Sequence, residues 1–376
     1  MTEGLKSVGL RIVRLAAVKP LERQRITSGF TPVVFLRGWR VNAIFALSLL
    51  CAWNVRANPT GGIVKHGGAT IVQNGDQVTI NQSTGMAILE WNSFSIAQGE
   101  TTKFIQPSSS SSALNRVNGG IQSLINGRLE ANGNIVLINP AGIVVGPSGV
   151  VNVNSFIAST RDVSDDDFLS GKGMKFQGSS EASIQNLGTI HAESGDIFLI
   201  AHSVINEGTL SAKKGTVGLV AANEVLLRPD GDEKLSILSQ EASGGKISHK
   251  GTIEAVTAEI KAAGNPYAVA INLDGVIQAK GTLGKKAKVI VDAGQGDIQM
   301  SKTAKIDAGG DSEGGKVIVQ SKGNLEIEGT ILATSASGNG GEVQLLGDSI
   351  HLSSTAVVDV SGFAGGGKIF VGDRKS

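Results

Sequence analysis

The chain has 376 residues, a formal net charge of +1, 40% hydrophobic residues and only 4% aromatic residues. It holds 51 glycines and 8 prolines; that glycine content is about twice the usual share. So much glycine with so little proline excludes a collagen-like or proline-rich chain and favours many turns joined by paired strands, and the apolar content excludes general disorder.

The positive charge is concentrated at the N-terminus. Residues 1–57 hold nine of the 34 Lys and Arg residues but two of the 33 Asp and Glu residues, a net charge of +7 that leaves −6 for the rest. An acidic remainder without a basic stripe indicates no nucleic-acid partner. Cys51, the only cysteine, lies in this segment, so the rest of the chain has no thiol for disulfides or thiolate metal sites.

A signal peptide is predicted within the same segment. Val41–Trp53 is a run of apolar or small residues behind a basic region, too short to span a bilayer comfortably and typical of a signal-peptide core. Val55 and Ala57 place small residues at positions −3 and −1 of a cleavage site. We expect residues 1–57 to be an extended signal peptide cleaved between Ala57 and Asn58; an uncleaved anchor is the alternative.

The next hundred residues are irregular but strand-rich. Ala87–Ile96 alternates, which predicts that Ile88, Trp91, Phe94 and Ile96 contact the core. Asn139–Gly142 is a predicted turn between strands at 136–138 and 143–145, because proline fixes one φ and glycine permits a positive one. Repeated asparagines near turns predict side-chain ladders between stacked strands: Asn132, Asn134, Asn139, Asn152 and Asn154.

Two further polar features are expected to be solvated. Asp165–Asp167 has no glycine-spaced ligand loop for calcium and is interpreted as a loop outside the main fold. The five histidines lie far apart, without metal-ligand spacing, and are interpreted as solvated or turn residues: His66, His191, His202, His249 and His351. We expect no metal and no cofactor.

The second half is an internal repeat. Gly-Thr-Ile phrases recur, and a Gly-Gly-Lys/Glu-Val/Ile phrase begins at Gly244, Gly314, Gly340 and Gly366, the last three 26 residues apart. Each phrase leads into a short alternating strand that cannot bury its apolar side alone, so stacking of 20–27-residue units is required. The pattern predicts an all-β fold, a parallel β-helix of about 13–14 coils with strands about 4.8 Å apart.

Five phrases in order within residues 58–160 resemble the N-terminal secretion domain of the filamentous haemagglutinin family, the exoproteins of two-partner secretion. The phrases are Trp91…Phe94, Asn115-Arg-Val117, Gly127…Gly133, Leu137-Ile-Asn-Pro-Ala-Gly-Ile143 and Ile157-Ala-Ser-Thr160. The wording of these phrases is most similar to the high-molecular-weight adhesins and the haem–haemopexin-binding exoproteins.

The resemblance implies a right-handed β-helix, with small extra-helical strands or hairpins near its N-terminal end. It implies export through the general secretory machinery and periplasm of a Gram-negative bacterium, then through an outer-membrane β-barrel transporter, to act as a secreted or surface adhesin on a host or neighbouring cell. Recognition by that transporter, or only tight turns, is expected of Asn115, Arg116, Asn139, Pro140, Gly142 and Ile143. Ala141 replaces the family's usual second asparagine.

This organisation gives three segments: the signal peptide 1–57, a secretion domain 58–180 and a repeat region 181–376 that is either truncated or a minimal body. A different class of function remains open, because parallel β-helices also include polysaccharide-degrading enzymes with clustered carboxylates or basic residues in a groove. Three or more converging Asp, Arg or Lys side chains would favour the enzyme, and a smooth polar face would favour binding.

Overall fold

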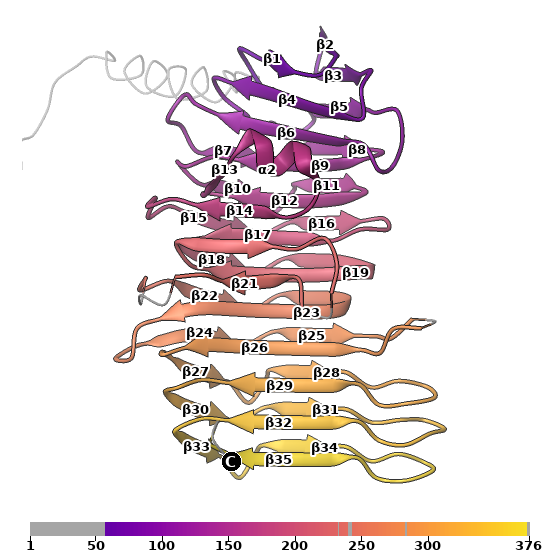
Figure 1. Cartoon of the computed structure of the whole chain (residues 1–376), viewed down its shortest axis with the longest axis vertical. Helices are drawn as coiled ribbons and strands as arrows, with labels where there is room; N and C mark the ends of the chain where they lie inside the picture. The colour runs from indigo at the N-terminus through magenta and orange to yellow at the C-terminus, as the bar shows by residue number, and fades with distance from the viewer. Residues whose placement is uncertain (1–56, 232, 240–242, 283, 374–376) are drawn as a thin grey trace, which may run out of the picture. The chain divides into compact units, whose positions relative to one another are not determined.

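The structure is a computed structural model that describes residues 57–373 except 232, 240–242 and 283. All of these belong to one compact unit, Val55–Ser376. The expected signal peptide, apart from Ala57, lies outside the described residues, as does Cys51. Within the unit, Figure 1 shows the chain passing coil by coil from β1 to β35.

Three columns of parallel strands make the solenoid, so the all-β parallel β-helix is confirmed. Column 1 contains β3(Gln77–Gln82), β5(Thr101–Ile105), β8(Arg128–Ala131), β11(Val150–Val153), β16(Thr189–Ala192), the first parts of β19(Thr209–Ala221) and β23(Thr252–Gly264), β25(Val276–Ala279), β28(Lys305–Asp307), β31(Thr330–Leu332) and β34(Val357–Asp359). Column 2 contains β4(Met86–Trp91), β6(Ser112–Val117), β9(Asn134–Ile138), β12(Ser155–Ser159), β17(Ile197–Ala201), the second parts of β19 and β23, β26(Lys288–Gly294), β29(Lys316–Gln320), β32(Glu342–Leu346) and β35(Lys368–Gly372). Column 3 contains β7(Ser123–Ile125), β10(Ile143–Val145), β15(Ser183–Asn186), β18(Ser203–Asn206), β22(Lys246–His249), β24(Val269–Leu273), β27(Asp297–Met300), β30(Asn324–Ile327) and β33(Ser349–Leu352).

Columns 1 and 2 each hold eleven strands in the described residues. The expectation of 13–14 coils was therefore too high. The number of coils is smaller than expected because part of the chain forms a cap at the N-terminal end and strands outside the solenoid.

The interior is filled by alternate side chains of successive strands. In β29, Val317 and Val319 are buried, and they pair in register with Val343 and Leu345 of β32. Because side chains of a strand alternate between faces, this register places one apolar set inside every coil. Each fully buried valine or leucine side chain contributes about 1.5–3 kcal/mol.

Close contact between coils explains the paired glycines of the repeat. A Cβ on Gly341 would lie 2.0 Å from the carbonyl oxygen of Gly315, and one on Gly367 would lie 2.0 Å from that of Gly341. No side chain fits such a gap. The 26-residue glycine phrase therefore marks the place where the backbone of one coil rests on the next.

An antiparallel cap precedes the first coil. β1(Ile63–His66) pairs antiparallel with β4, and β2(Ala69–Asn74) pairs antiparallel with β3. Val64, Ala69 and Ile71 pack against the main core. The expected extra strands near the N-terminal end are thus present, with reversed direction.

A second sheet lies outside the solenoid. β13(Asp162–Val163), β14(Met174–Gln177), β20(Glu224–Leu227) and β21(Leu235–Ile237) pair antiparallel, and α2(Asp165–Ser170) lies beside them in Figure 1. They cover a second apolar cluster in which outward side chains of column 2, such as Val136 and Phe198, pack with Phe168, Phe176 and Leu235. We call these four strands and α2 the outer sheet.

The three aspartates were expected in a loop, but they form the first turn of α2. Ser164 caps this helix by accepting a hydrogen bond from the Asp167 N–H at 3.0 Å, and Gly171 ends it with φ 63°. Acidic side chains stabilise the N-terminal turn of a helix, which explains the departure from a loop. Among the described residues no helix is long and apolar enough to cross a membrane.

Candidate secretion motif and charged groove

Asn115 points into the solenoid from β6 and is fully buried. Its Oδ1 accepts a hydrogen bond from the Trp91 indole N–H at 3.0 Å, and its Nδ2 donates to the carbonyl of Ala113 at 3.2 Å. Trp91 in turn packs edge-to-face on Phe94 with ring centroids 5.5 Å apart. The expected core positions of Trp91 and Phe94 are confirmed, and Asn115 is the polar partner that the indole requires.

Arg116 points outward and joins the solenoid to the outer sheet. Its Nε donates to Asp162 Oδ1 at 2.8 Å, its Nη1 donates to Asp165 Oδ1 at 2.5 Å, and its Nη2 donates to the carbonyl of Val163. Burial lowers the pKa of Arg116, but the hydrogen bonds to both aspartates outweigh it, so the pKa is raised and the charge is secure. This side chain therefore holds the start of the outer sheet against β6.

The Asn139–Gly142 turn joins columns 2 and 3 as predicted. The buried Asn139 accepts from the Ala141 N–H at 2.9 Å, and its Nδ2 donates to the Ile121 carbonyl at 2.8 Å and to Ser123 Oγ at 2.9 Å. Gly142 has φ 103°, which L side chains rarely adopt, and Ile143 is fully buried. Pro140 is exposed, and its carbonyl accepts from Ser180 Oγ at 2.6 Å.

Arg161 is a feature that the sequence analysis missed. It follows the Ile157–Thr160 phrase and is fully buried, with Nε donating to the Ala222 carbonyl at 2.9 Å and Nη2 to Asn223 Oδ1 at 3.0 Å. Nη1 donates to the Ser180 carbonyl. Burial lowers the pKa of this guanidinium. The arginine thus ties together the points where the chain leaves and rejoins the solenoid.

The expected cleavage point lies at the first described residues. Ala57 is half-buried, and Asn58 is 4% exposed. Asn58 Nδ2 donates to the carbonyl of Asp76 at 3.1 Å, and Asn58 Oδ1 accepts from Thr102 Oγ1 at 3.4 Å. Asn58 is therefore held inside the N-terminal end of the solenoid.

The predicted asparagine ladders are present in part. Asn154 Nδ2 donates to Asn134 Oδ1 at 2.9 Å. Asn132 instead bonds the backbone of Gln106 through both side-chain atoms, at 2.8 Å each.

A second ladder, which was not predicted, lies inside column 3. Asn186 Nδ2 donates to Asn206 Oδ1 at 2.8 Å, and Asn206 Nδ2 lies 3.0 Å from His249 Nδ1.

His249 was expected to be a solvated or turn residue, and that expectation was wrong. The side chain is fully buried, and Nε2 lies 3.2 Å from the carbonyl of Val276. With Nδ1 accepting and Nε2 donating, the ring is neutral. Burial lowers its pKa to about 4, against a smaller opposing effect of the Val276 carbonyl. His249 lies at the end of β22, within the interior ladder of column 3.

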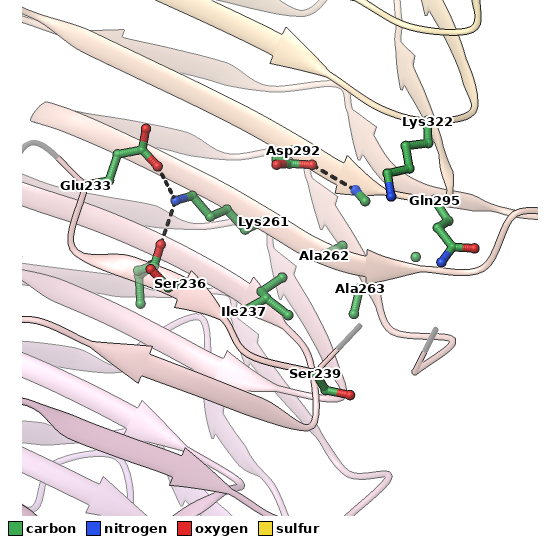
Figure 2. A pocket seen from close by; sticks show the side chains of 13 residues that line it. Glu233, Ser236, Ile237, Ser239, Lys261, Ala262, Ala263, Asp292, Gln295 and Lys322 are labelled. Carbon is green, nitrogen blue, oxygen red and sulfur yellow. Dashed lines mark hydrogen bonds and ion pairs between the residues drawn. The ribbon is translucent and has the colours of Figure 1, made fainter. Parts of the chain in front are cut away.

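A charged groove of about 470 Å³ lies beside β21, over the column-2 faces of β23 and β26. Figure 2 shows Glu233, Lys261, Asp292 and Lys322 around it, with Ser239 and Gln295. Lys261, Asp292 and Lys322 therefore line one groove, as the enzyme alternative requires.

Two of the groove's charged side chains, Lys261 and Glu233, are paired with each other. Lys261 Nζ is 2.9 Å from Glu233 Oε2 and 3.1 Å from Glu259 Oε2. Glu259 also accepts the N–H groups of Lys234 at 2.7 Å and Leu235 at 3.1 Å.

Glu233 is therefore a poor general acid. Burial raises its pKa, but Lys261 and then Lys288 lower it more, so the net pKa falls, whereas a general acid needs a raised pKa. The network attaches β21 to β23. Among the described residues no group of three or more His, Cys, Asp or Glu side chains could hold a metal ion.

Comparison with known proteins identifies the family. The family described as TPS secretion domain matches residues 55–290. The chain is 31% identical over 271 residues, 69% of its length, to a heme/hemopexin-binding protein of Haemophilus influenzae strain KW20, and 41% identical over 88 residues, 23% of its length, to a second Haemophilus influenzae heme/hemopexin-binding protein. It spans 29% and 10% of the length of those two relatives.

A solved structure shows the same fold. The secretion domain of HMW1 from Haemophilus influenzae is covered completely by 84% of this chain, with a TM-score of 0.56 and 23% sequence identity. At that identity the likeness concerns the fold alone. Together with the family match and the motif geometry above, these findings show that the chain belongs to the TPS secretion domain family, the exoproteins of two-partner secretion.

Proposed function

We propose that this protein is exported by a dedicated outer-membrane β-barrel transporter and acts outside a Gram-negative cell as a surface adhesin or binding protein. The match of residues 55–290 to the TPS secretion domain family carries the proposal. Residues 1–57 would direct the chain through the general secretory machinery to the periplasm, with cleavage between Ala57 and Asn58. A host or neighbouring cell surface would be the final partner.

The burial of the motif supports recognition of an unfolded chain. Asn115, Asn139 and Ile143 are fully buried, and Gly142 is enclosed with them. A transporter cannot contact these buried side chains in the folded β-helix. If the motif is the recognition signal, the transporter binds it before the coils stack, and the same residues later close the turns.

The transporter would then recognise residues 58–180 but not 181–376, although both segments belong to the same folded solenoid. All proposed recognition residues lie in 58–180. The outer sheet, however, pairs β14 with β20, and Arg161 bonds Ala222 and Asn223, so structure crosses the boundary. We propose that 58–180 is read by the transporter while both segments fold as one solenoid.

The binding role rests on the relatives. Two proteins to which the chain is similar are heme/hemopexin-binding proteins. Long polar faces of stacked strands suit binding to a surface. The pairing of Lys261 with Glu233 and Glu259 and the lowered pKa of Glu233 support a non-catalytic protein over the polysaccharide-degrading alternative.

The test is secretion of residues 1–376 in a Gram-negative host with and without a co-expressed two-partner transporter. We expect the protein in the medium only with the transporter, and in the periplasm without it. A transporter mutated in its periplasmic domains serves as the control for membrane leakage. Equal amounts in the medium under both conditions would refute the proposal.

A further inference from the structure

Glu100 is a buried carboxylate at the N-terminal end of the solenoid. It is 4% exposed. Its two oxygens lie 3.2 and 3.1 Å from the backbone nitrogen of Ala57, and Oε2 also accepts from the Ala97 N–H at 2.9 Å.

Glu100 has no cationic side chain beside it within the described residues. Two acids on strands of the first coils do have such partners: Glu90 of β4 pairs with Lys65 at 3.2 Å, and Glu130 of β8 with Arg128 at 3.0 Å. A carboxylate removed from water is unfavourable unless a positive charge compensates it. Two neutral N–H groups compensate it only in part. Glu100 contacts Ala57, the residue that precedes the expected signal-peptide cleavage point.

The residue after the expected cleavage point is fixed next to this carboxylate. Asn58 is 4% exposed, and its side chain is bonded to the Asp76 carbonyl and to Thr102 Oγ1. Thr102 is fully buried. Consecutive Cα atoms are about 3.8 Å apart, so a charge on the nitrogen of Asn58 lies one residue from the place now taken by the Ala57 N–H.

We propose that Glu100 is the counter-ion of the new N-terminus. Hydrolysis of the Ala57–Asn58 peptide consumes one water and leaves a carboxylate on Ala57 and an ammonium on Asn58. With Ala57 gone, both oxygens of Glu100 are open to the three N–H donors of this ammonium. A neutral peptide contact becomes a buried ion pair that closes the N-terminal end of the β-helix. The inference rests on the signal-peptide part of the proposed function.

The same geometry indicates whether cleavage or folding of the first coils comes first. The bond between Ala57 and Asn58 is enclosed in the folded protein, because Asn58 and Pro59 are buried. A peptidase needs an extended, accessible segment around the bond it cuts. Cleavage therefore precedes folding of the first coils, and folding then locks the new end in place.

The experiment uses the full chain secreted with its transporter. Mass spectrometry of the secreted protein gives its first residue, which we expect to be Asn58. The α-amine of the native protein is then labelled with an amine-acylating reagent between pH 6.5 and 10. An ion pair with Glu100 raises the α-ammonium pKa by about one unit above the usual 7.7–8.0, so that labelling is about fivefold slower at pH 8 and about tenfold slower at pH 6.5.

Two variants distinguish the ion pair from simple enclosure. Glu100→Gln removes the charge and should restore the ordinary pKa and fast labelling. Glu130→Gln removes a half-buried carboxylate that already has a cation, and should label as slowly as the parent. Equal labelling rates in the parent and in Glu100→Gln would overturn the proposal.

Two further results would contradict the role of Glu100. A first residue other than Asn58 overturns it, as does an α-ammonium pKa within 7.7–8.0 in the parent protein, which needs no variant if Glu100→Gln fails to fold. Secretion without the transporter would refute the export proposal alone, because the first residue and the amine pKa can still be measured on that material.

Discussion

The two halves of this β-helix share one core but are held together differently. Between Phe156 and Ala258, successive column-2 partners are 41, 20 and 41 residues apart, and the long intervals contain the outer sheet. From Lys316 to Lys368 they are 26 residues apart each time, with no strands outside the solenoid in the described residues. Glycine contacts space the coils in both halves, as with Gly251 on Gly208 and Gly341 on Gly315, and the first half adds the outer sheet with its second apolar cluster.

The largest expected loss tests the polar attachment in the first half. Arg161→Ala removes the donor of the buried Ala222 carbonyl and of two partly exposed oxygens, the Ser180 carbonyl and Asn223 Oδ1, and it creates a cavity, so we expect the free energy of unfolding to fall by about 4 kcal/mol. Guanidinium-induced unfolding measures it. Arg128→Ala, on an exposed arginine of β8, should cost less than about 1 kcal/mol. Equal losses would show that Arg161 is not a special attachment.

The second test is acid sensitivity of the interior ladder. The pKa of His249 in the folded protein, about 4, is below the usual unfolded value of about 6.5. Between these values the unfolded chain binds more protons, so stability falls as the pH is lowered, by about 1.4 kcal/mol per unit and about 3 kcal/mol in all. Unfolding from pH 7 to 4 measures the slope.

Asparagine at this position separates the histidine from other titrating groups. His249→Asn extends the Asn186–Asn206 ladder without a titrating ring, so its stability should fall less steeply between pH 6.5 and 4 than that of the parent. His351→Asn changes an exposed histidine and should keep the parental slope. An unchanged slope in His249→Asn would contradict the assignment.

The third test addresses backbone contact in the second half. Gly341→Ala would place a Cβ 2.0 Å from the Gly315 carbonyl oxygen, so two coils must separate, at a cost of about 2 kcal/mol. Gly366→Ala, in the same repeated phrase, meets nothing within 4 Å and should stay within about 0.5 kcal/mol of the parent. Thermal unfolding compares the two. Similar Tm values would mean that the glycine pairs do not space the coils.

The smallest expected stability effect separates folding from recognition in the motif. Asn139→Ala removes the turn's side-chain hydrogen bonds and should cost about 1.5 kcal/mol, whereas Pro140→Ala, at an exposed residue, should change stability by less than about 1 kcal/mol. Secretion yield with the transporter is measured for both. If the transporter recognises these side chains, both variants lower the secretion yield. If the residues only stabilise the turn, the yield falls only with Asn139→Ala.

The parallel β-helix, the Asn139–Gly142 turn and the Trp91 and Phe94 core positions were predictable, because each depends on local alternation or turn chemistry. Arg161 and His249 were not. Their burial follows from which coil lies against them, and an arginine without a carboxylate partner gives no local signal. The number of coils was overestimated because the whole length after residue 57 was divided by one repeat length, although the cap and the outer sheet also take up part of the chain.

The proposed recognition residues were predictable only as a motif. Asn115, Arg116 and Asn139 were named from their phrases, but the direction of each side chain requires the register between coils. Arg116 could not be assigned to Asp162 and Asp165, which are 46 and 49 residues away. Glu100 resembles any surface glutamate until the path of residues 57–59 is known.

The antiparallel cap strands β1 and β2 close one end of the solenoid. If folding begins at this end, each later coil adds to a ready template, because each coil contacts only its neighbours. A 26-residue coil takes up about 90 Å of extended chain while lengthening the solid by about 4.8 Å. For a chain threaded through a pore, folding from the capped end would therefore draw in a long extended segment for each small increase in the length of the solenoid.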